Sequence, residues 1–422
     1  MSLNSVNASI ITIGDELLIG QTIDTNSAFI AQELNKIGVW VRRRVAVGDV
    51  YDDIWQALDE ESQQSDIIII TGGLGPTADD ITKPLLCKYF GGKLVVNEKV
   101  LAHVKYLFEV VFRRPAPILD RNLKQAEVPD VCTVLHNARG TAPGMLFKKD
   151  GKSYISLPGV PHEMRGLIKA EVIPYLLSSF NMPAIVHQTA FTFGQGESQL
   201  AELLKDFEPS LPPHIKLAYL PNYGMVKLRL TSHGDNKEEV EKELAPYFEK
   251  LQELVKDFLV SNKDEGLEIV VGKLLQARGK TMATVESCTG GYIAHLITSN
   301  PGSSAYYKGS VISYANEVKE NVLGVNHDTL LSMGAVSEDT VKQMIAGAIK
   351  ELNTDFAIAT SGIMGPGGGT EEKPVGTVWI AAGNKEKTET MQLNLRFDRQ
   401  RNIIVTANQA LNFLRKFILA NS

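Results

Sequence analysis

Four consecutive isoleucines at 67–70 run directly into a glycine-rich loop, Thr71-Gly72-Gly73-Leu74-Gly75. A strand that is apolar on both faces fits where helices cover both sides of a sheet, as they do in parallel sheets. The flanking patterns agree: strands are expected at 8–13 and 39–47, and helices at 26–37 and 51–63. Residues 1–177 are therefore predicted to form a doubly wound, three-layer α/β domain.

The rest of the chain predicts two more folding units, because 422 residues exceed the usual size of one domain. A linker at 178–183 precedes a small α+β module at 184–258, with strands at 187–193 and 225–232 and helices at 197–206 and 237–258. A second linker at 261–266 leads into an α/β domain at 265–422. Its expected strands are 282–285, 311–314, 356–360 and 376–382, and its expected helices are 269–277, 292–297, 338–352 and 399–419.

Charge and cysteine content narrow the class of protein. The formal net charge is -6, and residues 186–260 carry eight Lys and Arg against twelve Asp and Glu, a balance of -4. This balance disfavours binding to nucleic-acid phosphates. The three cysteines are far apart and form no C-x-x-C pair, so neither a disulfide framework nor a zinc site is indicated. Without a leader pattern or a bilayer-spanning apolar segment, a cytoplasmic protein is expected.

The loop after the isoleucine strand has the features of a ligand loop. Its glycines let the backbone approach a ligand, and the helix that follows offers N–H donors to a phosphate. No Gly-Lys-Ser/Thr follows, so it is not a P-loop. The candidate ligand-binding residues are Gly72, Gly73, Gly75 and Thr77.

Acidic residues accompany this loop. Asp79 and Asp80 close it, while Glu16 and Asp24 lie near the end of the first strand, beside Asp15. First and third strands are commonly close in doubly wound sheets, so these carboxylates are candidates to share a divalent cation on a pyrophosphate. The alternative is that they are helix caps and solvated loop acids.

In the last domain, Ser287 lies at a strand-to-helix turn, Glu286-Ser287-Cys288-Thr289-Gly290-Gly291. The first N–H groups of a helix lack intrahelical partners and are candidates to hold a phosphate or an oxyanion. Lys319 is a candidate base if burial lowers its pKa, and Tyr314 is a candidate proton relay. The alternatives are an N-cap for Ser287, a surface charge for Lys319 and a core aromatic for Tyr314.

A second glycine loop follows the strand at 356–360. Its amides are candidates for anion binding, at Gly362, Gly365 and Gly367. Arg399 and Arg401, where the last helix begins, either clamp a phosphate or are exposed cations.

Several long motifs occur in a fixed order over nearly the whole chain. The N-terminal set, which comprises Gly14 to Leu18, Gly20 to Asn26, Thr71 to Asp80 and Leu157 to Met164, closely resembles the CinA family (competence/damage-inducible protein A). Its N-terminal domain is similar to molybdopterin-binding proteins. The C-terminal set resembles the nicotinamide-nucleotide amidohydrolase PncC, and comprises Glu286 to Gly291, Gly302 to Ser304, Tyr314 to Lys319, Gly334 to Ser337 and Glu371 to Val378.

For the C-terminal domain, the resemblance implies deamidation of nicotinamide mononucleotide to nicotinate mononucleotide and ammonia, a step of pyridine-nucleotide (NAD) salvage, without a cofactor. It assigns catalysis to Ser287, Tyr314 and Lys319, where Lys319 takes the proton of Ser287. The amides of Thr289, Gly290 and Gly291 would steady the oxyanion, and the second glycine loop with Arg399 would hold the substrate phosphate.

For the N-terminal domain, the resemblance implies hydrolysis of ADP-ribose to AMP and ribose 5-phosphate, with a divalent metal (Mg²⁺, Co²⁺ or Mn²⁺) and potassium. Asp24 and Asp80 match the acidic positions of the relatives' ligand loops, with Glu16 and Asp79 as additions. A homodimer is also implied. Two alternatives stay open: a molybdopterin-type ligand-binding protein, and a competence or recombination accessory protein that acts through contacts.

Overall fold

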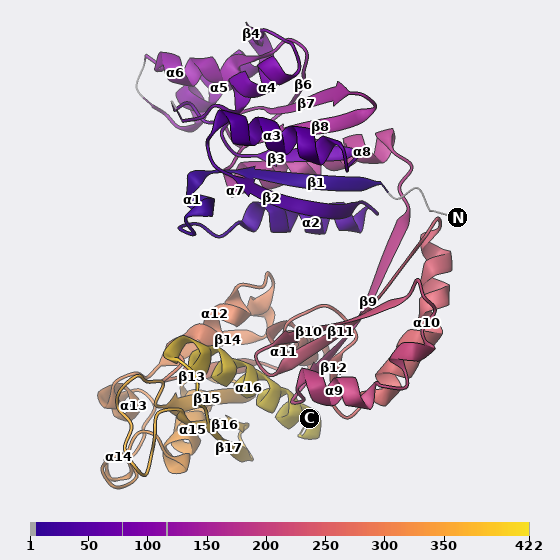
Figure 1. Ribbon diagram of the computed structural model, residues 1–422. Coiled ribbons are helices and arrows are strands. Elements are labelled where there is room, and N and C mark those ends of the chain that lie inside the picture. The colour runs from indigo at the N-terminus through magenta and orange to yellow at the C-terminus, as the bar shows by residue number, and fades with distance from the viewer. Residues whose placement is uncertain (1–5, 78, 115–116, 422) are drawn as a thin grey trace. The chain divides into compact units, whose positions relative to one another are not determined.

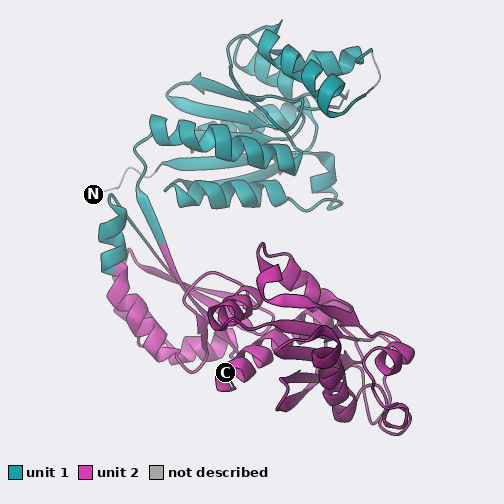
Figure 2. Ribbon diagram, turned by 180° about the vertical axis from the view of Figure 1, so that it is seen from behind, with its two compact units in different colours: residues 1–186, 232–243 teal, residues 187–231, 244–422 magenta. Residues whose placement is uncertain are grey.

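The structure is a computed structural model that describes residues 6–77, 79–114 and 117–421. The chain divides into two compact units. One comprises residues 1–186 and 232–243, and the other comprises residues 187–231 and 244–422 (Figure 2).

The N-terminal unit contains a six-stranded sheet in the order β2-β1-β3-β8-β7-β6 (Figure 1). Strands β2, β1, β3 and β8 run parallel to one another. Strand β7 pairs antiparallel with β8, and β6 pairs antiparallel with β7. The strands are β1 (Asn7–Ile13), β2 (Trp40–Val47), β3 (Ile67–Thr71), β6 (Thr133–Leu135), β7 (Gly144–Lys149) and β8 (Lys152–Leu157). Its α-helices are α1 (Asp15–Leu18), α2 (Thr25–Lys36), α3 (Tyr51–Ser62), α4 (Thr82–Tyr89), α5 (Glu98–Tyr106), α6 (Asp120–Leu123), α7 (Pro161–Leu167) and α8 (Ile173–Ser179), and β4 (Leu94–Val96) pairs with β5 (Glu127–Pro129).

The isoleucine strand is buried on both faces, as predicted. Ile67 and Ile69 belong to the core shared with α2, α7 and α8. Ile68 and Ile70 belong to the core shared with α3 and α4. All four side chains are 0% exposed, and each contributes about 1.5–3 kcal/mol of hydrophobic stabilisation. The prediction of a three-layer α/β domain is confirmed.

The middle module forms a four-stranded sheet in the order β10-β11-β9-β12. Its elements are β9 (Ala184–Phe193), α9 (Glu197–Leu203), β10 (Lys216–Asn222), β11 (Met225–Gly234), α10 (Lys237–Leu254) and β12 (Leu259–Ser261). The sequence predicted only β9 and β11. Strand β10 is largely exposed and contains Pro221, and β12 has three residues, so neither carries a clear apolar alternation.

The C-terminal domain is built on the sheet order β14-β13-β15-β16-β17, with the first three strands parallel and the last two antiparallel. The strands are β13 (Met282–Glu286), β14 (Tyr307–Ile312), β15 (Phe356–Gly362), β16 (Thr377–Gly383) and β17 (Thr388–Asn394). The helices are α11 (Leu267–Arg278), α12 (Tyr292–Thr298), α13 (Asn316–Asn321), α14 (His327–Ser332), α15 (Glu338–Leu352) and α16 (Arg399–Ala420).

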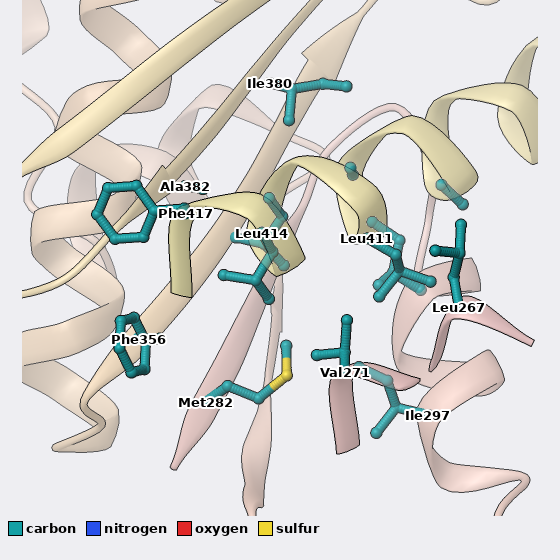
Figure 3. Packing of buried hydrophobic residues seen from close by; sticks show 14 of the residues in the cluster. Leu267, Val271, Met282, Ile297, Phe356, Ile380, Ala382, Leu411, Leu414 and Phe417 are labelled. Carbon is teal, nitrogen blue, oxygen red and sulfur yellow. The ribbon is translucent and has the colours of Figure 1, made fainter. Parts of the chain in front are cut away.

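Helices cover both faces of this sheet. Helix α16 lies across one face, where Leu411 and Leu414 pack among side chains of α11 and the strands (Figure 3), and α15 packs on the other face. Phe191 and Phe193 of β9 belong to the same buried cluster as α11 and α16. The middle sheet therefore shares a hydrophobic core with the C-terminal domain.

Several elements begin or end at other residues than expected, and one of these differences affects the site. The strand predicted at 311–314 is β14, which ends at Ile312, so Ser313 and Tyr314 lie in the loop before α13. None of the helices in the described part of the chain combines the length and the apolar composition that a membrane crossing requires.

Candidate active site

The three parallel strands of the C-terminal sheet end side by side, and a cavity of about 200 Å³ opens at those ends. This is where α/β sheets usually bind ligands. The cavity is lined by Ser287, Cys288, Tyr314, Asn316, Lys319, Ala335, Val336, Ser361, Gly362, Met364 and Arg399.

Ser287 and Lys319 meet at the bottom of this cavity. Lys319 Nζ lies 3.3 Å from Ser287 Oγ, and the lysine side chain is 1% exposed. Its nitrogen also donates to two carbonyl oxygens, at 2.6 Å to Ser313 and at 3.4 Å to Tyr314. Because β14 stops at Ile312, these carbonyls are free of the sheet ladder and hold the amine in place.

Burial controls the charge of Lys319. Loss of solvent lowers the pKa of its amine below the ordinary value of 10.5, and the nearby Cys288 and Glu317 oppose this shift. A lowered pKa increases the share of neutral amine near neutral pH. The neutral form is able to accept the Ser287 proton, and a hydroxyl beside a neutral amine is a nucleophile with its base.

The N-terminus of α12 is capped by the side-chain carboxylate of Glu286. Glu286, the last residue of β13, is 0% exposed, and its oxygens accept from the N–H groups of Gly291, Ile293 and Ala294 at 2.8–3.1 Å. They also accept from Thr289 Oγ1 at 2.8 Å. Glu286 therefore already uses the N–H groups of Gly291, Ile293 and Ala294, and of the three amides expected to steady an oxyanion it occupies that of Gly291.

Two amides of the serine turn remain for a ligand. Ser287 N–H donates to Thr360 O at 2.9 Å and Gly290 N–H donates to Ser287 O at 3.2 Å. Within the described residues, the N–H groups of Cys288 and Thr289 have no acceptor, and Cys288 lines the cavity. Burial raises the pKa of the Cys288 thiol to about 12, so the thiol stays protonated and does not compete with Ser287 as a nucleophile.

Tyr314 and Arg399 stand at the mouth. Tyr314 is 64% exposed, and its hydroxyl accepts from Arg399 Nη2 at 3.2 Å. Its side chain makes no hydrogen bond to Ser287 or Lys319 among the described residues, so Tyr314 contacts the pair through its carbonyl only. Arg399 also donates to Gly365 O at 2.8 Å.

The second glycine loop reaches the cavity in part. Gly362 lines it, while Gly365 offers its carbonyl to Arg399 rather than an amide to an anion. Gly367 is exposed and lies outside the lining. Met364 lines the cavity and is buried in the core, so it narrows the space beside Ser287.

In the N-terminal domain, Asp80 organises the glycine loop. Its carboxylate accepts from Gly75 N–H at 2.7 Å, from Thr77 N–H at 2.9 Å and from the Thr77 hydroxyl. Gly72 passes so close to β1 that a Cβ there would meet Ile13 O at 2.2 Å. Gly73 is packed against Thr82 in the same way. The loop is held by its own side chains, and Asp79 beside it is exposed.

Asp24 is the N-cap of α2, where it accepts from the N–H and the hydroxyl of Ser27. The next residue but one, Asn26, donates to Gly159 O at 2.7 Å and to Thr71 Oγ1 at 3.4 Å. Asn26 thus joins the glycine loop to the loop after β8. Sequence reasoning missed this role.

Acidic groups from three loops come together at this end of the sheet. The backbone N–H of Asp15 donates to the Asp49 carboxylate at 3.2 Å, and the backbone N–H of Asp49 donates to the Asp15 carboxylate at 3.1 Å. Burial, with Asp15, Glu16 and Asp79 nearby, raises the pKa of Asp49. Within the described residues, no three His, Cys, Asp or Glu side chains are arranged to hold a metal ion. The residues present therefore do not form a protein cage for the expected cation.

Sequence reasoning also missed residues of the C-terminal site. Glu286 belongs to the serine motif, but no role was predicted for it, although a carboxylate at the end of a buried strand just before a helix start is a signal for capping. Asn402 is 0% exposed and donates to Met364 O at 3.1 Å and to Phe397 O at 2.9 Å, so it fixes the glycine loop to the segment that carries Arg399.

Together the fold and the two sites define a class: a multidomain α/β protein with a molybdopterin-binding-like N-terminal domain and a buried serine–lysine pair in its last domain. Comparisons with known proteins agree. Residues 9–178 match the model "Probable molybdopterin binding domain", residues 187–260 match "Damage-inducible protein CinA KH domain", and residues 264–418 match "CinA C-terminal domain". The chain belongs to the CinA family.

Full-length relatives support this assignment. A CinA-like protein of Cytophaga hutchinsonii is 49% identical over 97% of this chain and 98% of its own length. Those of Flavobacterium psychrophilum and Chloroherpeton thalassium are 47% and 41% identical, over 99% and 98% of this chain and 99% and 100% of their own length.

The middle module matches a KH model but lacks the usual KH clamp. KH domains hold nucleic-acid backbones with a GXXG loop, and no such tetrapeptide occurs between 187 and 260. This agrees with the acidic balance of the module.

Proposed function

We propose that the C-terminal domain is a serine–lysine amidohydrolase that removes the carboxamide nitrogen of nicotinamide mononucleotide. The observation that carries the proposal is the buried contact of 3.3 Å between Lys319 Nζ and Ser287 Oγ at the bottom of a small cavity. The family resemblance supplies the substrate.

The reaction proceeds in two halves. Lys319 takes the proton of Ser287 while Oγ bonds to the carboxamide carbon, and the C–N bond then breaks as the lysine ammonium protonates the leaving nitrogen to give ammonia. Water next attacks the acyl ester and passes a proton to Lys319. That proton returns to Ser287 Oγ as the acid leaves.

Charge that develops on the carboxamide oxygen needs donors. The N–H groups of Cys288 and Thr289 are the candidates, because Gly291 N–H donates to Glu286 and the N–H groups of Ser287 and Gly290 donate to backbone carbonyls. At the mouth, Arg399 would bind the 5′-phosphate by exchanging its contact with the Tyr314 hydroxyl for the substrate. Before the substrate binds, the Tyr314 hydroxyl orients Arg399.

Ammonia release from nicotinamide mononucleotide tests the proposal. The wild type should release ammonia, and Ser287→Ala should not. Thr298→Ala is a matched control, since Thr298 is an exposed residue at the end of α12. An inactive wild type in a folded sample, or an active Ser287→Ala, would refute the mechanism.

For the N-terminal domain we propose hydrolysis of ADP-ribose-type diphosphates, with ADP-ribose itself as the substrate. The supporting observation is that acidic groups from the loops after β1, β2 and β3 gather beside the glycine loop. Within the described residues no three side chains form a metal cage, so a divalent cation would be held by the diphosphate of the substrate together with single carboxylates such as Glu16. ADP-ribose cleavage to AMP and ribose 5-phosphate, assayed with and without chelator, tests the proposal.

A further inference from the structure

The turn of the β10–β11 hairpin in the middle module contains a tyrosine at a position that disfavours bulky residues. Asn222 pairs with Met225, so Tyr223 and Gly224 form a two-residue turn. Their φ angles are 44° and 83°, as in a type I′ turn. Such turns strongly prefer Asn-Gly or Asp-Gly, because a bulky residue with positive φ is strained.

The two-residue turn between β7 and β8 contains the residues that such turns usually have. Lys149 pairs with Lys152 between β7 and β8, and the two residues between them are Asp150 and Gly151, with φ of 52° and 75°. The tyrosine is thus a departure from what the turn itself favours. Strain of this kind persists where the side chain has another task.

The ring of Tyr223 contacts the segment that begins α16. Arg401 Cζ lies 5.6 Å from the centre of the Tyr223 ring and 4.0 Å from the centre of the Phe397 ring. The guanidinium therefore contacts two aromatic rings, one from the middle module and one from the C-terminal domain. Each such contact is worth about 0.5–1 kcal/mol at an exposed site.

The segment held in this way carries Arg399. On its inner side, buried Asn402 bonds to Phe397 and to Met364 O. On its outer side, Arg401 and Phe397 meet Tyr223. Between these two attachments, Arg399 extends to Tyr314 and Gly365 at the mouth of the cavity.

The turn of the hairpin is also held by contacts within the middle module and with the C-terminal domain. Gly194 N–H donates to Gly224 O at 3.1 Å, and Met225 packs against the cluster that contains α11 and α16. The tip of the β10–β11 hairpin is therefore fixed next to α16 of the C-terminal domain.

We propose that Tyr223 is a positioning residue of the amidohydrolase site, which holds the segment 397–402 so that Arg399 meets the 5′-phosphate of the substrate. The inference rests on the proposed function of the C-terminal domain. It gives the middle module a role in substrate selection: the hairpin favours phosphorylated nucleosides over free ones.

The test uses the full chain with Tyr223→Asn, which suits the turn but removes the ring. Relative to the wild type, KM for nicotinamide mononucleotide should rise about 2–5-fold, with kcat within about twofold and an equal or higher Tm. The kcat/KM for nicotinamide riboside, which lacks the phosphate, should not change. Tyr223→Phe should restore the wild-type KM, and Asp150→Asn is the matched control at the other turn.

Binding separates this inference from the proposed function. Calorimetry should give a Kd for nicotinamide mononucleotide that is about 2–5-fold weaker in Tyr223→Asn. Equal Kd values would overturn the inference, whether or not ammonia is released, and an equal loss for the riboside would mean that the ring only stabilises the fold. A wild type that binds the nucleotide without releasing ammonia would overturn the function alone, and one that does not bind it would overturn both.

Discussion

Lys319 Nζ and Ser287 Oγ lie 3.3 Å apart although 32 positions separate the two residues in the chain. Parallel pairing of β13 with β14 produces this contact, since it places the ends of both strands together. The lysine follows on α13 and turns back into the cavity. Its two carbonyl partners, Ser313 and Tyr314, fix the amine at the serine.

Loss of either member should abolish deamidation. Ser287→Ala and Lys319→Met should each lower kcat by about 10³-fold or more, and the double variant should be little worse, because the two act as a unit. Steady-state ammonia release measures this. Strictly multiplicative losses would contradict a shared proton transfer.

The lowered pKa of Lys319 predicts the pH dependence of the reaction. Activity needs the neutral amine, so kcat/KM should rise with pH on the acid side and level off above the lysine pKa, which lies below 10.5. Lys319→Arg should lose this limb together with most activity, since a guanidinium stays protonated. A flat profile in the wild type would exclude the lysine as the base.

The lowered pKa of Lys319 also predicts a change in stability. Unfolding returns the amine to its ordinary pKa of 10.5, so between the lowered and the ordinary value the unfolded state binds more protons and stability rises with pH. Lys319→Met lacks this contribution. The free energy of unfolding of the wild type, minus that of the variant, should therefore increase as the pH is raised towards 10.5. Each tenfold loss of proton affinity on folding corresponds to about 1.4 kcal/mol of this increase. Urea denaturation at several pH values measures it, and parallel curves would contradict the assignment.

Glu286 should be a determinant of both stability and catalysis. Glu286→Gln replaces one accepting oxygen by an NH₂ group among N–H donors, so about 1–3 kcal/mol of stability should be lost. Because the serine turn loosens, kcat should fall more than KM rises. Glu268→Gln is a control, since Glu268 is a partly buried acid on α11. An unchanged Tm and kcat in Glu286→Gln would show that capping of α12 by the Glu286 carboxylate is needed neither for stability nor for catalysis.

The sequence predicted those parts of the molecule that depend on local pattern. The four isoleucines of β3 predicted a strand that is buried on both faces. The pattern around Ser287 predicted a turn between a strand and a helix. What it missed depends on side-chain direction and on contacts far apart in the chain. Glu286 turns inward and takes the amide of Gly291, which was expected to steady an oxyanion. Tyr223 contacts Arg401 although 178 positions separate the two residues in the chain.

The N-terminal domain offers a test in which structural and metal-binding roles separate. Asp80→Asn should lower stability by about 0.5–2 kcal/mol, as losses of capping carboxylates do, because Asp80 holds Gly75 and Thr77. Lost activity in that variant would therefore not identify a metal ligand. Glu16 is exposed, so Glu16→Gln should leave Tm unchanged and yet weaken cation binding, and it should raise the Mg²⁺ or Mn²⁺ concentration needed for half-maximal ADP-ribose cleavage several-fold. Chelation should stop cleavage by the wild type, and added cation should restore it. Full turnover in the presence of chelator would rule out a metal at this site, and an unchanged cation requirement in Glu16→Gln would place it on other groups.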